Sequence, residues 1–482
     1  MNRTTHKNTM PHYTVQEIMQ RDASSKLHVV IVGAGLGGLG AAIAVRLAGH
    51  DVTVLEAAPS IGEVGAGIQV LPNASRVLFS WGLEDRLLKF ATRPSKCNFI
   101  GWKGNHLSEM DYHGYAAATG NYPFLDFHRA TLHGCLLDRS KELGVKILTG
   151  ASVEKYAITD DDTTATVHLA DGRTIVSDLV VGADGINSKL REQFLGKTDP
   201  PQLTGDLAYR LLLSTAEMLK DPDLRPFVEN PQVNYWVGPD KHAVNYVLKG
   251  GELFNMVLLV PDDIPLEQGN TLHGTMDEMR AHFADWDPRI GKMLSLCDSV
   301  GSILKWRLCI RPGLDPTWSD PSGAFTMLGD AVHATLPYLA SGAGMALEDG
   351  GVLGLCLARL TDKSPESKRK VLDVYEACRR ERTEKVVQRG TYNQWIYHLS
   401  DGPEQQERDE RFKQFGDFDH AWLSGEDPVL PKSEETGEDP FPWRYNGVGR
   451  WLLTYDMWKD VEAKFSKVEG SSSGVESVRA SL

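Results

Sequence analysis

The most regular pattern of apolar and polar positions lies near the N-terminus, between residues 29 and 56. The apolar run Val29–Val32 predicts a buried parallel strand, and Ala41–Leu47 is typical of a helix. The glycine-rich turn GAGLGG separates them, and a second apolar run, Val52–Leu55, ends at the acidic residue Glu56. A strand, glycine turn, helix and second strand, with an acid about 20 residues past the glycines, indicate a dinucleotide-binding unit.

The glycines of this turn have separate physical roles. Gly33 permits the tight turn, Gly35 lets the backbone approach a pyrophosphate, and Gly38 lets the helix pack closely on the strand. The phosphates would lie at the helix N-terminus, where free N–H groups and the helix dipole favour anions. Glu56 would accept hydrogen bonds from ribose hydroxyls. The alternative, a flexible glycine loop, does not account for the strands and the helix around it.

Three later runs extend the same sheet. Lys146–Thr149 is a short strand candidate, and Leu179–Val181 and Ala324–Leu328 are apolar strands. The last two run into turns that combine glycine with an acid, Gly182–Gly185 and Gly329–Ala331. Because ligands bind at the carboxyl ends of the strands in an open parallel sheet, these turns are expected to converge on one site.

Strand patterns of another kind follow. Thr164–Leu169 alternates and runs into an Asp-Gly turn, which predicts a hairpin. Between residues 201 and 304, the short strands Val233–Val237, Ala243–Leu248 and Leu253–Val260 are separated by glycine turns. They predict an antiparallel meander, and therefore a second domain inserted into the nucleotide fold, to which residues 95–123 contribute.

The C-terminal third is expected to be mainly helical. Ser364–Leu399 is long, charged and typical of a helix, and Trp451–Phe465 predicts a final packed helix. Residues 401–445 are rich in Pro, Gly, Asp and Glu, and we interpret them as loop. The final GSSSGVESVRASL has a disordered composition, and residues 1–26 predict a loose tail without the apolar core of a signal peptide.

Composition narrows the class of protein. The 482 residues have a net charge of −14, which argues against a nucleic-acid partner. The six cysteines are scattered without a CxxC pair, as in a protein of a reducing compartment, and we expect a cytoplasmic location. No segment predicts a membrane span, and neither HExxH nor another metal-binding spacing is present, so no metal site is expected. Nothing in the sequence sets the oligomeric state.

Three segments, GAGLGGLGAAIAVRLAGHDVTVLE, DLVVGADGINSKLR and GDAVHATLPYLASGAGMALEDG, resemble group A flavoprotein aromatic monooxygenases. The similarity is greatest to the salicylate-hydroxylase-like members, including fungal ones that act on polyketides and alkaloids. It implies FAD as cofactor and NAD(P)H as a transiently docked reductant, because no second nucleotide fold is present. The implied reaction uses O₂ and a flavin C4a-hydroperoxide to hydroxylate an aromatic small molecule, in secondary metabolism.

The resemblance and the strand pattern together predict an α/β protein: a Rossmann-like FAD-binding fold with an inserted antiparallel-sheet substrate domain and C-terminal helices. The expected boundaries are an N-terminal tail 1–26, FAD-binding parts 27–94, 124–200 and 305–361, substrate-domain parts 95–123 and 201–304, a C-terminal helical region 362–468 and a disordered tail 469–482.

Further cofactor-binding residues follow from the resemblance alone. Gly65 and Gly67 match a loop that runs beside the flavin, and Arg129 matches an arginine that holds the cofactor. Asp184, with Gly185, matches a motif that braces the cofactor and reductant sites. For Asp184, helix capping is the alternative role.

The third matching segment supplies the residues nearest to the flavin ring. Asp330 matches an acid near the ribityl and pyrophosphate groups, with helix capping as the alternative, and Pro337 matches a proline at the reactive edge. Gly342, Ala343 and Gly344 match a loop whose backbone N–H groups face the pyrimidine ring. Because reduced flavin is anionic, N–H groups and a helix dipole there would stabilise it.

Candidate catalytic residues lie in the inserted domain. Arg210 is flanked by apolar residues, where a guanidinium is costly without a partner, and similar proteins place here an arginine that binds phenolate or carboxylate. A structural salt bridge is the alternative. Tyr235 and Tyr246 lie on neighbouring strands and are candidates for the substrate pocket, although sheet packing is the more common role for a tyrosine at such a position. Since a strand alternates its faces, Tyr235 and Trp236 point in opposite directions.

The same motifs leave other functions open. One is epoxidation of an alkene or indole by the same flavin chemistry, and another is a non-catalytic FAD-binding regulator. The sequence does not identify the substrate or decide between NADH and NADPH.

Overall fold

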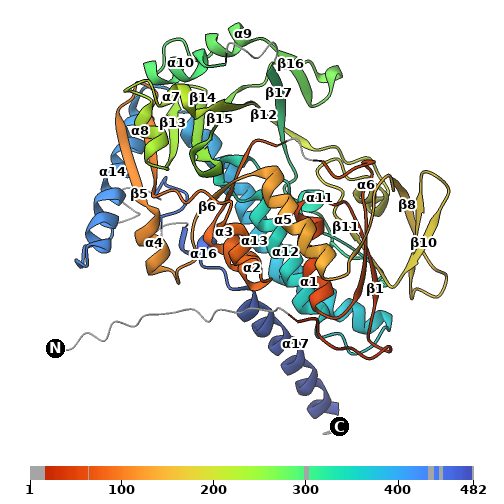
Figure 1. Ribbon diagram of the computed structural model, residues 1–482. Coiled ribbons are helices and arrows are strands. Elements are labelled where there is room, and N and C mark those ends of the chain that lie inside the picture. The colour runs from red at the N-terminus through yellow and green to blue at the C-terminus, as the bar shows by residue number, and fades with distance from the viewer. Residues whose placement is uncertain (1–16, 63–64, 298–302, 432–438, 445–448, 480–482) are drawn as a thin grey trace.

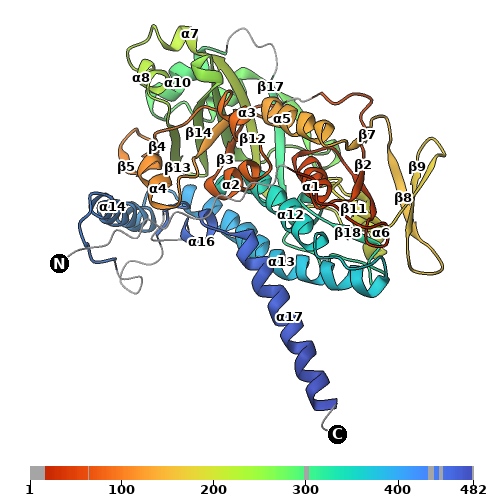
Figure 2. The ribbon, with the colours of Figure 1, turned by 60° about the horizontal axis from the view of Figure 1, so that its bottom comes forward.

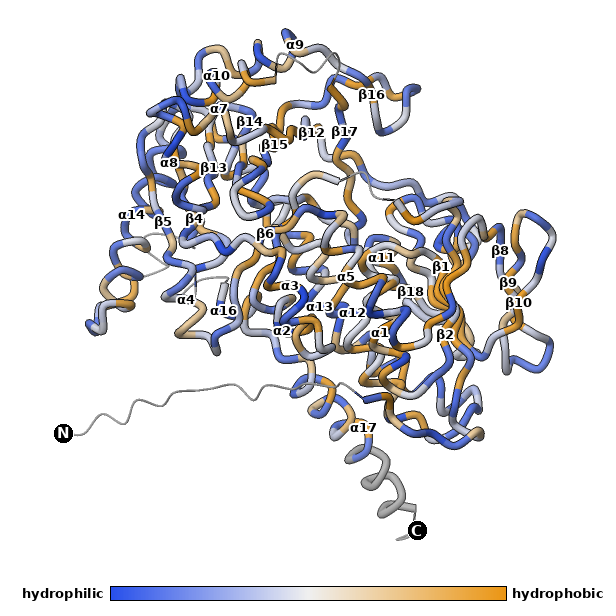
Figure 3. Tube along the Cα trace, viewed as in Figure 1, coloured by the Kyte–Doolittle hydropathy of each residue, from blue (hydrophilic) through white to orange (hydrophobic). Residues whose placement is uncertain are grey.

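A five-stranded parallel sheet forms the centre of the nucleotide-binding region (Figure 1). The computed structural model describes residues 17–62, 65–297, 303–431, 439–444 and 449–479. The sheet has the order β18 (Phe325–Met327), β11 (Leu179–Gly182), β1 (His28–Val32), β2 (Asp51–Leu55) and β7 (Lys146–Leu148). All four pairings are parallel, with Val30 of β1 beside Val180 and Thr53. The apolar colour along β1 and β2 in Figure 3 is expected for strands that are covered on both faces.

Helices cover this sheet because small residues let them approach closely. Helix α1 (Leu36–Leu47) packs most extensively against α12 (Gly342–Leu357). A Cβ atom added to Gly350 would lie 2.6 Å from the backbone nitrogen of Ala41, so only glycine fits at this crossing. Helix α5 (Arg129–Glu142) also contacts α1, and α13 (Pro365–Tyr397) lies along α12 (Figure 2).

The predicted hairpin is confirmed and belongs to a separate small sheet. Strands β8 (Val153–Ile158), β9 (Ala165–Leu169) and β10 (Thr174–Ser177) are antiparallel and lie at one side of the molecule (Figures 1 and 2).

An eight-stranded sheet forms the second domain. Its order is β16 (Thr271–Gly274), β17 (Ile303–Ile310), β12 (Gln202–Ser214), β15 (Leu253–Pro261), β14 (Lys241–Leu248), β13 (Val233–Gly238), β4 (Lys96–Gly101) and β5 (His106–Asp111). The predicted meander β13–β14–β15 is antiparallel, whereas β13 and β4 pair in parallel. One face carries Tyr235 and packs toward the cavity described below, while the other carries Trp236 and is covered by short helices. The predicted fold class is therefore confirmed.

The remaining described elements are short or connect the two domains. They are β3 (Gly67–Val70), α2 (Pro72–Ser80), α3 (Glu84–Leu88), α4 (Tyr112–Ala118), β6 (Leu125–His128), α6 (Lys189–Leu195), α7 (Thr215–Met218), α8 (Arg225–Glu229), η1 (Lys249–Gly251), η2 (Leu266–Gln268), α9 (Met276–Ala281), α10 (Pro288–Ser295), α11 (Asp330–His333) and η3 (Pro337–Leu339).

The loop predicted for residues 401–445 is wrong over its first half, where helix α14 (Pro403–Leu423) forms. Proline is compatible with a first helical turn, and the Glu, Gln and Arg residues that follow are good helix formers. Phe412 anchors the helix, since its ring centroid lies 4.8 Å from that of Phe99 on β4.

The single helix predicted at 451–465 is two helices, α16 (Gly449–Leu453) and α17 (Met457–Arg479). The break follows from Arg76, whose Nη1 donates to the carbonyl oxygens of Thr454 (3.2 Å) and Tyr455 (2.6 Å). Asp456 then accepts from the backbone N–H of Lys459 and begins the next helix. Helix α17 extends away from the body (Figures 1 and 2).

The prediction of a disordered tail from residue 469 is also wrong, because helix α17 continues to Arg479. Once the packed turns are formed, each added residue gains a helical hydrogen bond at little further cost. The predictions for residues 1–16 and 480–482 lie outside the described residues.

Candidate flavin and substrate site

A cavity of about 370 Å³ lies where the carboxyl ends of the parallel strands face the inner side of the eight-stranded sheet. The sequence-predicted residues that line it are Gly35, Gly38, Gly67, Arg129, Arg210, Tyr235, Tyr246, Asp330, Pro337, Gly342 and Ala343. The structure thus brings together the residues of the nucleotide fold and the inserted domain. The predicted residues that do not line the cavity are Gly33, Glu56, Gly65, Asp184 and Gly344.

The glycine turn after β1 has the geometry of an anion site. Gly33 has a φ of +108°, and a Cβ atom there would lie 2.3 Å from the carbonyl oxygen of Ala183. A Cβ atom on Gly38 would lie 2.0 Å from the carbonyl oxygen of Gly33. Gly35 differs, because a Cβ atom there would meet nothing within 4 Å. Its backbone is therefore open to the cavity at the N-terminus of α1, as a pyrophosphate requires.

Glu56 braces this turn rather than lining the cavity. Its Oε2 accepts from the backbone N–H of Ala34 (2.9 Å), and its Oε1 accepts from that of Ala58 (2.8 Å). Each oxygen retains a lone pair for a ribose hydroxyl, so the predicted contact with ribose stays a prediction.

The two aspartates behave differently. Asp330 begins α11, caps no helix with its side chain, and remains exposed because it faces the cavity. Although the carboxylate faces the cavity, the protein atoms around it keep it away from bulk water, and this desolvation raises the pKa of Asp330. The positive charges of His333 and Arg129 oppose the rise. Asp184 instead accepts from the hydroxyl of Ser188 (2.6 Å) and the backbone N–H of Leu190 (3.2 Å). Asp184 therefore supports the start of α6, whose N-cap is Ser188, and its neighbour Gly185 lines the cavity.

Gly65 and Gly344, which the sequence also predicts as cofactor-binding residues, do not line the cavity. A Cβ atom on Gly344 would lie 3.4 Å from Cβ of Ala74, because the turn of α12 directs this residue toward α2 while Gly342 and Ala343 face the cavity. A Cβ atom on Gly65 would lie 2.9 Å from Cβ of Arg129. The close approach at Gly65 explains glycine there without a cofactor contact, whereas the contact at Gly344 is an ordinary van der Waals distance.

Arg210 lies on the cavity wall. It makes no hydrogen bond or ion pair with any residue in the described ranges, so the structural salt bridge is not supported. Its guanidinium carbon lies 5.9 Å from the ring centroid of Trp306. Burial and the nearby Arg129 both lower the pKa of Arg210, which is the effect of an unpaired charge.

The tyrosines line the cavity and also pack within the sheet. Tyr235 stacks on Phe99, with ring centroids 5.0 Å apart, and the hydroxyl of Tyr246 would lie 2.6 Å from a Cβ atom on Gly67. Neither hydroxyl has a hydrogen-bond partner in the part of the chain that the structure describes. Trp236 points to the opposite face and donates to Asp287 (3.1 Å), as strand alternation requires.

The sequence did not single out the rest of the substrate side. This part of the cavity wall also includes His242, Val244, Val257, Leu259 and Tyr338. The alternation of Val244 with Tyr246 along β14 is the signal that could have placed the valine on this face.

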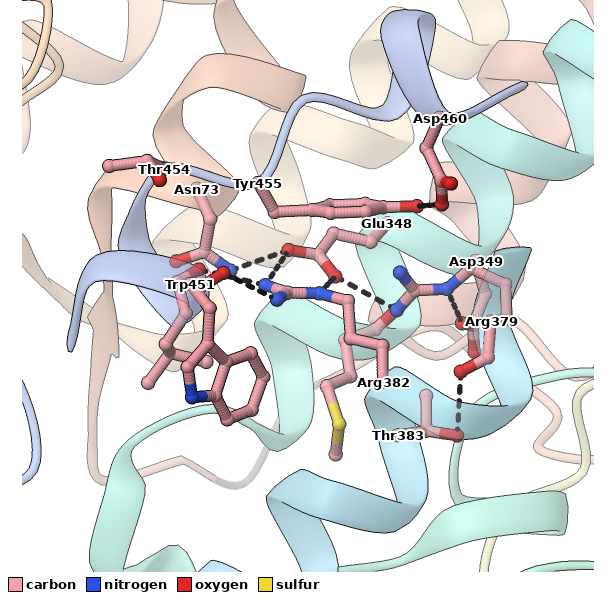
Figure 4. Close-up of polar contacts among 12 residues, drawn as sticks. Asn73, Glu348, Asp349, Arg379, Arg382, Thr383, Trp451, Thr454, Tyr455 and Asp460 are labelled. Atoms are coloured by element: carbon pink, nitrogen blue, oxygen red, sulfur yellow. Dashed lines mark hydrogen bonds and ion pairs between the residues drawn. The ribbon is translucent and has the colours of Figure 1, made fainter. Parts of the chain in front are cut away.

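A buried ionic cluster joins helix α12 to helix α13 (Figure 4). Glu348 and Asp349 of α12 face Arg379 and Arg382 of α13, and all four are buried. Glu348 Oε2 lies 2.8 Å from both guanidinium groups, and Asp349 Oδ1 accepts from Nε of Arg379 (2.7 Å). Asn73 of α2 donates to Glu348 (2.7 Å). The cluster therefore joins three helices.

The cluster also reaches the turn that carries Asp330. Oδ2 of Asp349 accepts from the backbone N–H of Gly329 (2.9 Å) and lies 2.6 Å from Nε2 of His333. Although burial favours the neutral acid, His333 and Arg379 lower the pKa of Asp349 to about 2. An ionised Asp349 therefore fixes the turn, and no feature of the sequence pattern had indicated it.

The fold and the site define a flavoprotein with a nucleotide-binding fold. The family model described as FAD binding domain matches residues 26–280. FAD-dependent monooxygenase OpS4 from Beauveria bassiana is 42% identical over 389 residues, which cover 80% of this chain and 88% of that protein. 3-Amino-4-hydroxybenzoate 2-monooxygenase from Streptomyces cremeus is 32% identical over 418 residues, covering 86% and 99%.

The solved structure of a salicylate hydroxylase substrate complex shares the fold, with a TM-score of 0.71 at 22% identity and coverage of 92% and 98% of the two chains. This chain belongs to the family of FAD-dependent aromatic monooxygenases, and FAD is its cofactor. The open backbone at Gly35 and the cavity-facing carboxylate of Asp330 fit this cofactor.

No helix among the described residues has both the length and the apolar character needed to cross a bilayer. Within the same ranges, no group of three or more His, Cys, Asp or Glu side chains is arranged to hold a metal ion.

Proposed function

We propose that this enzyme uses NAD(P)H and O₂ to hydroxylate an aromatic small molecule that carries an acidic oxygen, as phenolate or carboxylate. The observation that supports this proposal is Arg210, which has no ion pair or hydrogen bond with any residue in the described ranges and lies on a wall of aromatic and aliphatic side chains. An anionic ring would supply the missing counter-charge and fill the apolar surface. Two similar proteins are named for a hydroxybenzoate and for salicylate, which combine these features.

Residues on one side of the cavity would bind FAD, and residues on the other side would enclose the substrate. The N-terminus of α1 would hold the pyrophosphate, Asp330 would contact the ribityl region, and the N–H groups at the start of α12 would face the ring. Bound FAD supplies the redox chemistry, which accepts hydride from NAD(P)H and activates O₂. The apolar Val244, Val257 and Leu259 would keep water from the reacting oxygen.

Arg210 would set the ionisation state of the substrate. A fixed positive charge close to a phenol stabilises its phenolate, and a phenolate ring is richer in electrons and therefore reacts more readily with activated oxygen. Tyr235 and Tyr246 would donate their free hydroxyls to the bound ring's polar substituents.

The test is reductant consumption by FAD-loaded protein, with NADH and NADPH compared, in the presence and absence of salicylate, 3-hydroxybenzoate and 3-amino-4-hydroxybenzoate. Substrate-stimulated oxidation with one hydroxylated product per reductant supports the proposal. Reductant oxidation that yields only peroxide would indicate an oxidase. An epoxide product would indicate the epoxidase, and failure of either reductant to reduce the flavin would indicate a regulator.

We also assign the reaction to secondary metabolism, on the resemblance to fungal members of the family, and to the cytoplasm. The second assignment is supported by the six cysteines, which are all free thiols and buried.

A further inference from the structure

Residues 451–456, which we call the C-terminal strap, are held by two buried arginines from different helices. The last carbonyl groups of an α-helix have no partner within it, and the end of α16 presents such groups. Arg382 of α13 donates from Nη1 to the carbonyl oxygen of Trp451 (2.9 Å) and from Nη2 to that of Leu452 (2.8 Å). Arg76 of α2 holds two further carbonyl oxygens of the strap. The two cations therefore cap the end of α16, where the helix dipole favours positive charge.

Aromatic rings of the strap cover the arginines of the ionic cluster (Figure 4). The ring centroid of Tyr455 lies 4.2 Å from the guanidinium carbon of Arg382 and 5.2 Å from that of Arg379. The ring centroid of Trp451 lies 5.3 Å from the guanidinium carbon of Arg382. The hydroxyl of Tyr455 donates to Asp460 of α17 (2.9 Å), which fixes the ring in this position. The strap therefore holds the cluster through its side chains as well as its backbone.

The strap also belongs to the hydrophobic cores of both domains. Leu452 and Leu453 are buried in the core that contains the cavity-facing side chains of the eight-stranded sheet. Met457 and Val461, which directly follow the strap, are buried in the core of the nucleotide fold. A Cβ atom on Gly351 of α12 would lie 2.5 Å from the sulfur of Met457, so the chain packs closely on that helix. The strap thus joins the two domains that enclose the cavity.

A short series of contacts connects the strap to the first turn of α12. Arg382 donates from Nε and Nη2 to the two carboxylate oxygens of Glu348, at 2.8 Å each. Asn73 of α2 donates to the same carboxylate, and its Nδ2 would lie 3.6 Å from a Cβ atom on Gly344. Glu348 lies within two helical turns of Ala343, which lines the cavity. The arginine that holds the strap therefore also holds the end of α12 that faces the cavity.

We propose that the C-terminal strap positions the first turn of α12 against the flavin ring and thereby raises the reduction potential of bound FAD. The inference rests on the proposed function, in which the N–H groups of this turn face the ring. The positive end of the helix dipole stabilises the anionic reduced flavin, so a turn that is less firmly held favours the oxidised form. None of residues 451–456 is among the described residues that line the cavity, so they act as positioning residues.

The experiment measures the midpoint potential of the FAD-saturated full chain, without substrate, by equilibration with an indicator dye during photoreduction. The variant is Tyr455→Leu, which removes the ring over the two arginines. Because burial raises the pKa of Tyr455, its side chain is neutral at neutral pH and the substitution removes no charge. We expect the equilibrium between oxidised and reduced flavin to shift about fivefold toward the oxidised form, the scale of a helix-dipole effect. For a two-electron couple this is a decrease of about 20 mV.

The matched control is Phe465→Leu. The ring of Phe465 is also buried and covers an arginine, since its centroid lies 4.7 Å from the guanidinium carbon of Arg359. Arg359 follows the C-terminal end of α12, away from the turn that lines the cavity, so the control should keep the wild-type potential. The thermal midpoint is measured for every variant. Where Tyr455→Leu does not fold, Trp451→Leu removes the other ring over Arg382 and decides the question.

The outcomes separate a positioning role from a structural one. A wild-type potential in the strap variants, with a lowered thermal midpoint, overturns the proposal and leaves the strap a purely structural element. An equal decrease in Phe465→Leu overturns it as well, because loosening either end of α12 would then have the same effect. The potential is measured without substrate, so a wild-type protein that hydroxylates no aromatic acid contradicts the proposed function and not the positioning role.

Discussion

Replacing Arg210 by glutamine tests the substrate site most directly. The variant removes a positive charge from the cavity wall but keeps a side chain of similar length that can donate hydrogen bonds. Arg210 has no ion pair within the described part of the chain, so the substitution breaks no salt bridge. We therefore expect the thermal midpoint and the FAD content to remain at wild-type values or to rise slightly.

The expected loss lies in catalysis. A hydrogen bond to a charged group is worth about 1.5–3 kcal/mol, which corresponds to roughly 10- to 150-fold in substrate affinity. If the guanidinium also stabilises charge that develops in the transition state, product formation falls by about 10²-fold or more. Arg210→Lys keeps the charge but lacks the planar fork that binds two oxygens, so its activity should lie between those of wild type and Arg210→Gln.

The assay is product yield per NAD(P)H at matched FAD occupancy for wild type, Arg210→Gln and Arg210→Lys. Reductant consumption should continue in the glutamine variant and be diverted to peroxide. Normal rate and coupling in Arg210→Gln, or a midpoint several degrees lower with intact catalysis, would show that the residue is structural. The search for the anion-binding group would then turn to Tyr235 and Tyr246.

Four further predictions concern the cofactor side and stability. Asp330→Ala should lose FAD on gel filtration while the product of the FAD-saturated variant is unchanged. Glu56→Ala should weaken FAD binding about ten- to a hundredfold, from the loss of charge-assisted hydrogen bonds worth about 1.5–3 kcal/mol, as measured by flavin fluorescence titration. Glu348→Gln should lower unfolding free energy by about 3–5 kcal/mol in denaturant melts, because it leaves buried arginines short of a counter-charge, whereas the exposed control Glu381→Gln should not. His50 is buried, and burial lowers its pKa to about 4, so the unfolded chain takes up its proton first. Stability should thus be complete above about pH 6.5 and decrease as the pH falls toward 4, with a flatter pH dependence of the thermal midpoint in His50→Gln.

The parts of the fold that the sequence predicts are those with a local physical signature. Strand β1, the glycine turn and α1 are contiguous, and the steric demand at Gly38 arises against Gly33 of the same turn. The steric demand at Gly33 arises against Ala183, which follows the distant strand β11 and carries no local signal. The meander β13–β14–β15 is equally local, because its turns lie between adjacent strands. The parallel pairing of β4 with β13 joins segments more than 130 residues apart, and no pattern in either strand indicates that the two pair.

Helix α14 shows how composition misleads. Counted together over residues 401–445, the Pro, Gly, Asp and Glu residues indicate a loop. The helix is held by a few buried positions, such as Phe412 against Phe99 and the Nη1 of Arg408 that donates to the carbonyl oxygen of Ile396 (2.9 Å). Those contacts join segments distant in the sequence, so tertiary packing adds to the helix propensity of the Glu, Gln and Arg residues in forming the element.

The ionic cluster marks the boundary of what the sequence can predict about the site itself. Along α13 the charges around Arg379 and Arg382 look like those of a solvated helix face, yet both side chains are buried against Glu348 and Asp349. Removing four charges from water is favourable only when every partner is in place, so the cluster specifies one docking of α13 on α12. Because Asp349 also holds the turn at Gly329, that docking fixes Asp330 at the cavity. The position of the carboxylate that is predicted to contact FAD thus depends on a helix whose sequence carries no cofactor motif. Glu348→Gln should therefore weaken FAD binding more than an equally destabilising substitution remote from the cavity does.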